Sequence, residues 1–273
     1  MTRSLPILYR DDDCVAVAKP AGLLVHRTHL DPEDSVFALQ IVRDQLGCWV
    51  HPVHRLDKPT SGVLLFALDA EMARNLGDAF QAGRMKKTYV AVVRGYCPES
   101  GVVEHVVVVD RPSRGKWVAG VGPDEATHRV ADEESGDGGS ARVSAPAPAV
   151  TEYERLATVE LPVSVETYPT SRYSLVRLSP HTGKRHQLRK HLKHLGHPII
   201  GDVRYGRGAH NRYFRDELGA GRLLLAATEL QFVQPRTGAA VRIVAPLDET
   251  MTGLLGRFGW TDAVPKEWIA AQD

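Results

Sequence analysis

An uninterrupted apolar run at residues 63–68 (VLLFAL), entered from a charged turn, constrains this chain more than any other feature. A run this short, bounded by turn residues, predicts a buried strand. The turn lies in residues 54–63 (HRLDKPTSGV) and places one carboxylate, Asp57, between the cations Arg55 and Lys58. An aspartate in that setting is a candidate nucleophile or general base, and the alternative is a solvated structural turn residue.

The remaining periodicity predicts more strands than helices. Strand patterns occupy residues 9–19, 87–94, 102–109, 172–178, 223–232 and 241–244. Helical spacing predicts helices at residues 35–46 and 185–195, and another that Asp69 caps and Gly83 ends. Because the strands follow one another as meanders, the pattern predicts an α+β fold with a largely antiparallel sheet.

Composition excludes several classes of protein. The hydrophobic content of 43% and the charged content of 25% are ordinary for a soluble globular protein. No apolar run approaches the roughly 20 residues of a membrane helix, and the early acidic residues are unlike a secretory signal. Three cysteines without Cys-x-x-Cys spacing support neither a disulfide framework nor a cysteine zinc site. We therefore expect a cytoplasmic protein that contacts no membrane.

Charge is distributed unevenly along the chain. The net charge is only +1, but residues 181–215 are rich in Lys, Arg and His, which still allows an RNA partner because phosphate contacts are local. Residues 120–150 are poor in large apolar residues and predict a flexible insertion without a core of its own. The histidines of the basic segment lack the spacing of a metal site, so we expect no bound metal.

Five sequence blocks, in order, resemble the RluA-type pseudouridine synthase family. Residues 54–63 match its His-Arg-Leu-Asp signature, in which two variable residues precede Thr-Ser-Gly. The others are residues 19–26 (KPAGLLVH), 87–91 (KTYVA), 182–189 (TGKRHQLR) and 196–202 (GHPIIGD). The resemblance implies a mixed, largely antiparallel sheet with a central cleft flanked by helices and loops. It also implies a single catalytic domain at residues 1–273, without the small N-terminal RNA-binding module of many relatives.

The resemblance also implies a set of site residues and no cofactor. Asp57 would be the nucleophile that isomerises uridine, and Arg189 its electrostatic partner. Arg55 would enter the RNA stack and hold the target uridine outside it; the alternative is a plain salt-bridge partner. Tyr89 would lie against the uracil, with Leu188 in the floor beneath it. Neither a metal nor an organic cofactor would take part.

RNA contacts would extend along the predicted helix at residues 185–195. Arg185, Arg189 and Lys193 recur there at i, i+4 and i+8 and predict a basic row facing the RNA backbone, with leucines anchoring the opposite side. The closest resemblance is to the branch of the family that modifies uridine 65 of tRNA. A ribosomal RNA target and a non-catalytic RNA-binding protein on this scaffold are the alternatives. We expect the protein to act as a monomer.

Overall fold

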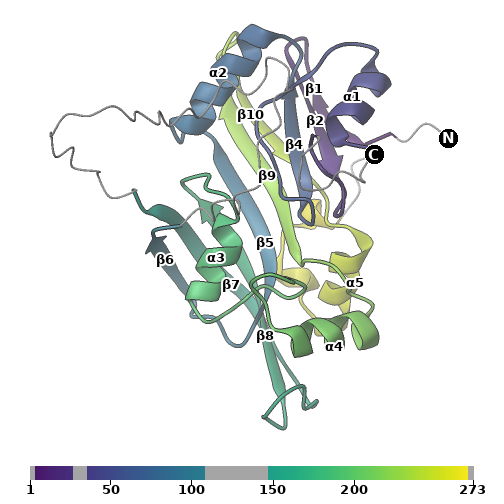
Figure 1. Ribbon diagram of the computed structural model, residues 1–273, viewed down its shortest axis with the longest axis vertical. Coiled ribbons are helices and arrows are strands. Elements are labelled where there is room, and N and C mark those ends of the chain that lie inside the picture. The colour runs from purple at the N-terminus through teal and green to yellow at the C-terminus, as the bar shows by residue number, and fades with distance from the viewer. Residues whose placement is uncertain (1–3, 27–35, 108–146, 270–273) are drawn as a thin grey trace, which may run out of the picture.

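The computed structural model describes residues 4–26, 36–107 and 147–269, and one ten-stranded sheet forms its centre (Figure 1). The main path of the sheet runs β1-β2-β4-β9-β5-β8-β7-β6, with β10 paired to β9 and β3 to β4. The β4–β9 pair is parallel and the other described pairs are antiparallel. The strands are β1 (Ile7–Arg10), β2 (Cys14–Lys19), β3 (His51–Pro52), β4 (Ser61–Ala67), β5 (Lys86–Arg94), β6 (Ser100–His105), β7 (Ala149–Leu161), β8 (Ser171–Pro180), β9 (Leu225–Val233) and β10 (Ala240–Val244).

In the described part of the chain, five α-helices pack on this sheet, and two short 3-10 turns follow the last of them. The helices are α1 (Ala38–Leu46), α2 (Ala70–Gln81), α3 (Gln187–His194), α4 (Gly208–Leu218) and α5 (Glu249–Phe258). Helices α1 and α2 lie beside the upper strands in Figure 1, whereas α3, α4 and α5 lie beside the lower ones. These helices and the sheet confirm the α+β class with a mixed, largely antiparallel sheet.

Within the described ranges, no helix combines the length and the apolar content needed to span a membrane.

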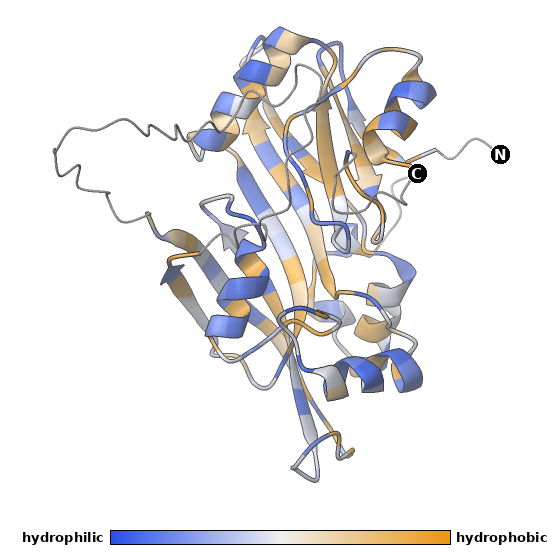
Figure 2. Cartoon of the chain, in the orientation of Figure 1, coloured by the Kyte–Doolittle hydropathy of each residue, from blue (hydrophilic) through white to orange (hydrophobic). Residues whose placement is uncertain are grey.

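Both faces of the sheet are buried at β4, which explains the uninterrupted apolar run. In β4 all seven residues are buried: Val63 and Leu65 join the core under α2, whereas Leu64 and Phe66 join the core under α1. Successive residues of a strand point to opposite faces, so a strand covered on both sides must be apolar throughout. Figure 2 shows the same division, with orange along the central strands and blue on the outward faces of the helices.

The N-terminal strand prediction was wrong in one respect. Residues 9–19 form two antiparallel strands, β1 and β2, rather than one. Asp11 Oδ1 accepts the backbone N–H groups of Asp13 and Cys14 at 2.8 and 2.7 Å, and this side-chain turn breaks the strand. The run of acidic residues was the available signal for the turn.

Helix starts also differ from the predictions. Helix α1 begins at Ala38, and the expected start at residue 35 lies outside the described residues. Helix α3 begins at Gln187, two residues after the expected start, because His186 has left-handed backbone angles. By contrast, the prediction for α2 is confirmed: Asp69 accepts the N–H of Met72 at 2.8 Å, as a helix cap does.

The sequence pattern missed β7, α4 and α5. Ala149 and Val150 belong to β7, so the proposed insertion at residues 120–150 was placed too far along the chain, and its remaining part below residue 147 lies outside the described residues. Likewise, β6 ends at His105 and the expected strand end at residue 109 lies outside them.

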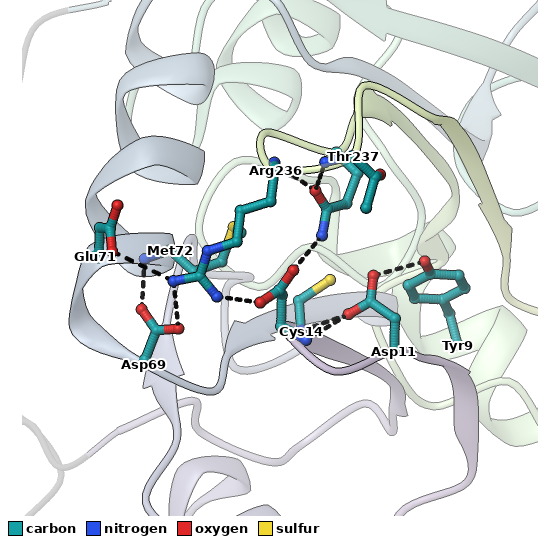
Figure 3. Close-up of polar contacts among 10 residues, drawn as sticks. Tyr9, Asp11, Cys14, Asp69, Glu71, Met72, Arg236 and Thr237 are labelled. Atoms are coloured by element: carbon teal, nitrogen blue, oxygen red, sulfur yellow. Dashed lines mark hydrogen bonds and ion pairs between the residues drawn. The ribbon is translucent and has the colours of Figure 1, made fainter.

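Arg236, in the turn between β9 and β10, ties three segments together (Figure 3). Its guanidinium pairs with Asp13 of the β1–β2 turn and with Asp69 at the start of α2, the latter at 2.9 Å. Gln234 donates a further bond to Asp13 at 2.5 Å. These contacts fasten the β1–β2 and β9–β10 turns to the start of α2, at the end of β4 opposite to the end that the loop of Asp57 enters.

Candidate active site

Asp57 lies in the loop that leads into β4, and backbone contacts fix this loop. The Asp57 carbonyl accepts the N–H of Thr60 at 2.9 Å, which closes a turn. The carbonyl of Lys58 accepts the N–H of Gly22 at 2.8 Å and the Nζ of Lys19 at 3.2 Å. The loop is therefore fastened to the chain segment that follows β2.

Lys19 is the buried anchor of that fastening. Its side chain is 1% exposed, and Nζ also donates to the carbonyls of Pro20 and Leu23 at 2.9 and 2.7 Å. Burial lowers the pKa of the Lys19 ammonium to about 7, and the charge of Asp57 acts in the opposite direction. Lys19 thus supplies hydrogen bonds beneath the loop that carries Asp57, and it adds a positive charge there when it is protonated.

Arg189 of α3 contacts Asp57, although the two residues are far apart in the sequence. Its Nη1 lies 3.2 Å from Asp57 Oδ2, while Nε and Nη2 bind the two oxygens of Asp202 at 2.7 and 2.8 Å. Such a paired, parallel contact fixes the guanidinium plane. Arg189 is 6% exposed and Asp202 2% exposed, so the pair is buried, whereas Asp57 is more open to solvent.

Asp202 remains ionised in spite of its burial. Burial raises the pKa of its carboxyl group, but the Arg189 guanidinium and the N–H groups of Tyr205 and Arg204 outweigh that effect and lower the pKa below its ordinary value. A carboxylate that accepts several N–H groups next to a cation is stabilised as the anion. Asp202 is therefore the fixed counter-ion that aims Arg189 at Asp57.

Strand pairing brings Tyr89 to the same place. Gly62 of β4 lies opposite Ala227 of β9, and Ala227 lies opposite Tyr89 of β5. Burial of the Tyr89 phenol raises its pKa, and the charge of Asp57 raises it further. Tyr89 is thus within electrostatic reach of Asp57 and stays a neutral phenol.

His186 and Tyr205 complete the surroundings of Asp57. His186 Nε2 lies 3.8 Å from Asp57 Oδ2, and Nδ1 lies 2.9 Å from the hydroxyl oxygen of Tyr205. Leu188, next to Arg189 in α3, is buried in the core cluster that Tyr89 packs against. A carboxylate, a guanidinium, an imidazole, two phenols and an apolar side chain therefore meet at one point on the sheet.

Comparisons with known proteins agree with this arrangement. The sequence model of a family described as RNA pseudouridylate synthase matches residues 13–194. The chain belongs to this family. It is 45% identical to the tRNA pseudouridine synthase C of Haemophilus ducreyi, over 94% of this chain and 96% of that protein. It is 44% identical to the enzyme of the same name from Yersinia pestis, over 96% and 93%.

Comparison with solved structures supports the same family assignment. Human RNA Pseudouridylate Synthase Domain Containing 4 is 26% identical, with a TM-score of 0.64 and 93% of each chain covered. Human RNA Pseudouridylate Synthase Domain Containing 1 is 25% identical, with a TM-score of 0.62, over 90% of this chain and 85% of that one. The fold and the enzyme class predicted for the chain, an isomerase acting on RNA uridine, are thereby confirmed.

The pseudouridine synthase site brings together only some of the residues predicted from sequence. Asp57, Tyr89 and Arg189 surround one point, with Leu188 in the core beside them. Arg55 is exposed on the loop of Asp57. The roles assigned to these side chains remain predictions.

The predicted basic row on α3 differs from the structure in two respects: Arg185 precedes the helix, and Arg189 is buried rather than facing solvent. Arg189 and Lys193 do share one face of the helix, since both lie near the ring of Tyr205. The helix starts later because the Gln187 side chain holds the preceding turn. Arg185 and Lys193 are both exposed, and their contact with RNA stays a prediction.

Sequence analysis missed Lys19, His186, Asp202 and Tyr205 as individual site residues. The first three lie inside blocks that match the family, so their letters were in view, but nothing local indicates which side chain turns toward Asp57. Within the described ranges, no group of three or more His, Cys, Asp or Glu side chains is arranged to hold a metal ion.

Proposed function

We propose that this protein converts one uridine of tRNA to pseudouridine, with uridine 65 as the target, and that Asp57 carries out the chemistry. The observation that carries the proposal is the contact between Asp57 and Arg189, within a family-specific motif and next to the buried counter-ion Asp202. The tRNA substrate is supported by the names of the full-length relatives. Uridine 65 rests on the resemblance to the branch that modifies it.

Isomerisation to pseudouridine breaks the bond between the ribose C1′ and N1 of uracil and forms one between C1′ and C5. One proton leaves C5 and one is gained at N1, so no atoms are lost overall. Attack by Asp57 on either the ribose or the ring requires the ionised carboxylate. Arg189 stabilises that anion in a site that becomes drier when a base enters it.

The roles of Tyr89 and Leu188 follow from their surroundings. The raised pKa keeps the Tyr89 phenol protonated at neutral pH, so it has no phenolate with which to accept a proton. We therefore assign Tyr89 to stacking on the uracil rather than to removal of the C5 proton. Leu188 supplies the apolar surface beneath the ring. Both assignments explain how a free uracil could be retained between bond cleavage and reattachment.

Arg55 and the two exposed cations near α3 complete the proposed RNA contacts. A base inside a duplex must leave the stack before its glycosidic bond can be reached, and a planar guanidinium can stack in its place. Arg55 is exposed two residues from Asp57 and fits this role. Arg185 and Lys193 would bind the RNA backbone, since both are exposed beside the site.

The proposal includes a monomeric, cytoplasmic enzyme made of a single catalytic domain that works without metal or organic cofactor. A ribosomal RNA substrate is the second candidate, because the site chemistry would be the same. A non-catalytic RNA-binding protein would have no need for a buried Asp202–Arg189 pair aimed at a second carboxylate. Burying an ion pair carries a desolvation penalty, and the orientation that the pair gives Arg189 is a reason to keep it.

The test of the proposed function combines a genetic and a biochemical measurement. Pseudouridine is mapped in tRNA and ribosomal RNA from cells lacking the gene, and loss at position 65 of tRNA alone is the expected result. The purified Asp57→Asn variant should form no pseudouridine while its RNA affinity stays within about threefold, because phosphate contacts supply most of the binding. Wild-type turnover by Asp57→Asn would exclude Asp57 as the nucleophile.

A further inference from the structure

His186 has a backbone conformation that its residue type does not favour. Among the described residues it is the one non-glycine residue with a positive φ, at φ 57° and ψ 24°. The Cβ of an L-residue is crowded in this region, whereas glycine adopts it freely. A non-glycine residue is uncommon in this region, and such a residue beside a site motivates the hypothesis that its side chain is used.

The neighbouring residue imposes this conformation. Gln187 Oε1 accepts the hydroxyl of Thr182 at 2.8 Å and the N–H of Lys184 at 3.0 Å. Its Nε2 donates to the carbonyl of Val150 at 3.0 Å and to the hydroxyl of Thr151 at 2.9 Å. Gln187 thus ties the turn before α3 to β7, and His186 is held with its ring pointing toward Asp57.

The two ring nitrogens of His186 face different partners. Nε2 lies 3.8 Å from Asp57 Oδ2, the same oxygen that Arg189 Nη1 approaches at 3.2 Å. Nδ1 lies 2.9 Å from the Tyr205 hydroxyl oxygen. A neutral imidazole carries one proton, and the partner of one nitrogen decides which nitrogen bears it. If the Tyr205 hydroxyl donates to Nδ1, the proton is on Nε2 and faces the carboxylate.

The charges around the ring favour this arrangement. Burial and the guanidiniums of Arg189, Arg185 and Arg204 lower the pKa of His186, and Asp57 raises it; the net effect is a pKa below the ordinary value. The ring is therefore neutral at pH 7. A carboxylate next to Nε2 attracts the N–H rather than the lone pair.

The ring of Tyr205 is fixed by cations, independently of its hydroxyl group. Four side chains lie 5.1 to 5.9 Å from the ring centroid: Arg189, Arg204, Lys193 and Lys190. Cations over an aromatic face are attracted to it. Asp202 also accepts the backbone N–H of Tyr205 at 2.9 Å, so the residue that orients Arg189 orients Tyr205 as well.

We propose that Tyr205 and His186 are positioning residues for Asp57: Tyr205 sets the tautomer of His186, and His186 Nε2–H holds Oδ2 of the carboxylate together with Arg189. This rests on the proposed role of Asp57 in the reaction. The 3.8 Å separation is longer than a hydrogen bond, so at this distance the N–H and the carboxylate attract each other electrostatically. Holding one oxygen from two sides leaves the carboxylate a single orientation in which to react.

Three variants of the full chain test the proposal: His186→Gly, His186→Gln and Tyr205→Phe. Each is assayed for single-turnover rate at saturating enzyme, RNA affinity and melting temperature. His186→Gly should turn over about 100-fold more slowly, since misorientation of a reacting group has effects of that size. Its melting temperature should be equal or higher, because glycine adopts this conformation freely. RNA affinity should stay within about threefold, because phosphate contacts dominate it.

The two conservative variants test single groups: His186→Gln tests the ring N–H of His186, and Tyr205→Phe tests the hydroxyl group of Tyr205. His186→Gln should recover part of the rate, since its amide can donate to Asp57. Tyr205→Phe keeps the ring that the cations contact and should turn over about tenfold more slowly through loss of orientation. Nitrogen-15 NMR of the His186 ring, assigned by difference with His186→Gln, should show the proton on Nε2.

Matched controls are Tyr213→Phe and His51→Gln, which lie outside the site and should behave as wild type. The proposal is overturned by wild-type turnover in His186→Gly or Tyr205→Phe, by rate losses that follow RNA affinity or melting temperature, or by a proton on Nδ1. Asp57→Asn belongs in the same series. An active Asp57→Asn would contradict the proposed function itself, whereas an inactive one with an active His186→Gly contradicts only this inference.

Discussion

At the scale of single residues, one guanidinium serves two carboxylates. Arg189 gives its paired contact to Asp202 and its remaining Nη1 to Asp57. The buried Asp202 therefore receives the stronger geometry, and the more open Asp57 receives a contact that a substrate can rearrange. This division lets a cation support a reactive carboxylate without locking it into a closed salt bridge.

Replacing Arg189 should affect folding as well as turnover. Arg189→Ala leaves the buried Asp202 without its cation, and breaking such a pair typically costs about 3–5 kcal/mol. Arg189→Lys keeps the charge but cannot reach both carboxylates, so it should melt closer to wild type and still turn over slowly. Thermal melting and single-turnover assays measure the two effects, with the exposed Arg172→Ala as control. An Arg189→Ala protein as stable as wild type would contradict the structural part of this prediction.

Lys193 should contribute to RNA affinity without sequence preference. It is exposed on α3, and loss of one phosphate contact lowers the slope of log affinity against log salt by roughly one. Lys193→Ala should therefore weaken binding to tRNA and to unrelated RNA by the same factor, measured between low and moderate salt. Lys266→Ala, exposed near the C-terminus, is the matched control. An unchanged salt slope for Lys193→Ala would show that the residue does not contact phosphate.

Sequence identified the residues proposed to react better than the residues that support them. Asp57 and Arg189 occupy family motifs, and the structure places them in contact. Lys19, Asp202 and Tyr205 act through partners that are distant in sequence or reached around a loop, such as the contact of Lys19 with the Lys58 carbonyl. Local patterns carry no information about such contacts, because they form only when the sheet assembles.

At the scale of elements, the parallel pair β4–β9 determines where the loop of Asp57 lies. Gly62 has a φ of 116°, and a Cβ on it would lie 2.0 Å from the carbonyl oxygen of Ala227. Only glycine allows the two backbones this close approach. Because Tyr89 pairs with Ala227 from the other side, the same contact sets the distance between Tyr89 and the loop.

Gly62→Ala should therefore be harmful to both stability and turnover. Overpacking of this kind typically costs about 1–3 kcal/mol, and the backbone shift would move Asp57 away from Arg189. Chemical denaturation and single-turnover assays measure the two effects. Gly77→Ala in α2 is the matched control: nothing lies within 4 Å of the added methyl group, so it should stabilise the protein by about 0.5–1 kcal/mol. Equal stability of the two variants would contradict the close-approach explanation.

Elements buried on both faces or capped by a clear side chain were predictable, as β4 and α2 show. β7 was missed because only its first half alternates buried and exposed residues; the second half is partly exposed throughout. Helix α3 started late because a turn fixed by Gln187 takes up the first residues of an otherwise helical pattern. Tertiary contacts decided each of these outcomes.

At the scale of the whole molecule, buried neutral histidines link stability to pH. Burial lowers the pKa of His54 to about 3 and that of His191 to about 4. His54 Nε2 accepts the N–H of Leu65 at 3.1 Å, and His191 Nδ1 lies 3.0 Å from the Thr151 hydroxyl. Both rings are therefore held in the neutral form by the sheet and its helices.

Stability should fall when the pH is lowered from 6.5 to 5, before the carboxyl groups titrate. In this interval the unfolded chain binds protons on these histidines and the native protein does not, so each contributes up to about 1.4 kcal/mol per pH unit to the loss. Urea denaturation at pH 7.5, 6.5, 5.5 and 5 measures the slope, which should be shallower in His54→Gln by the contribution of one proton. Gly77→Ala, which changes no titratable group, is the control and should keep the wild-type slope. An unchanged slope in His54→Gln would show that His54 does not remain neutral in the folded protein.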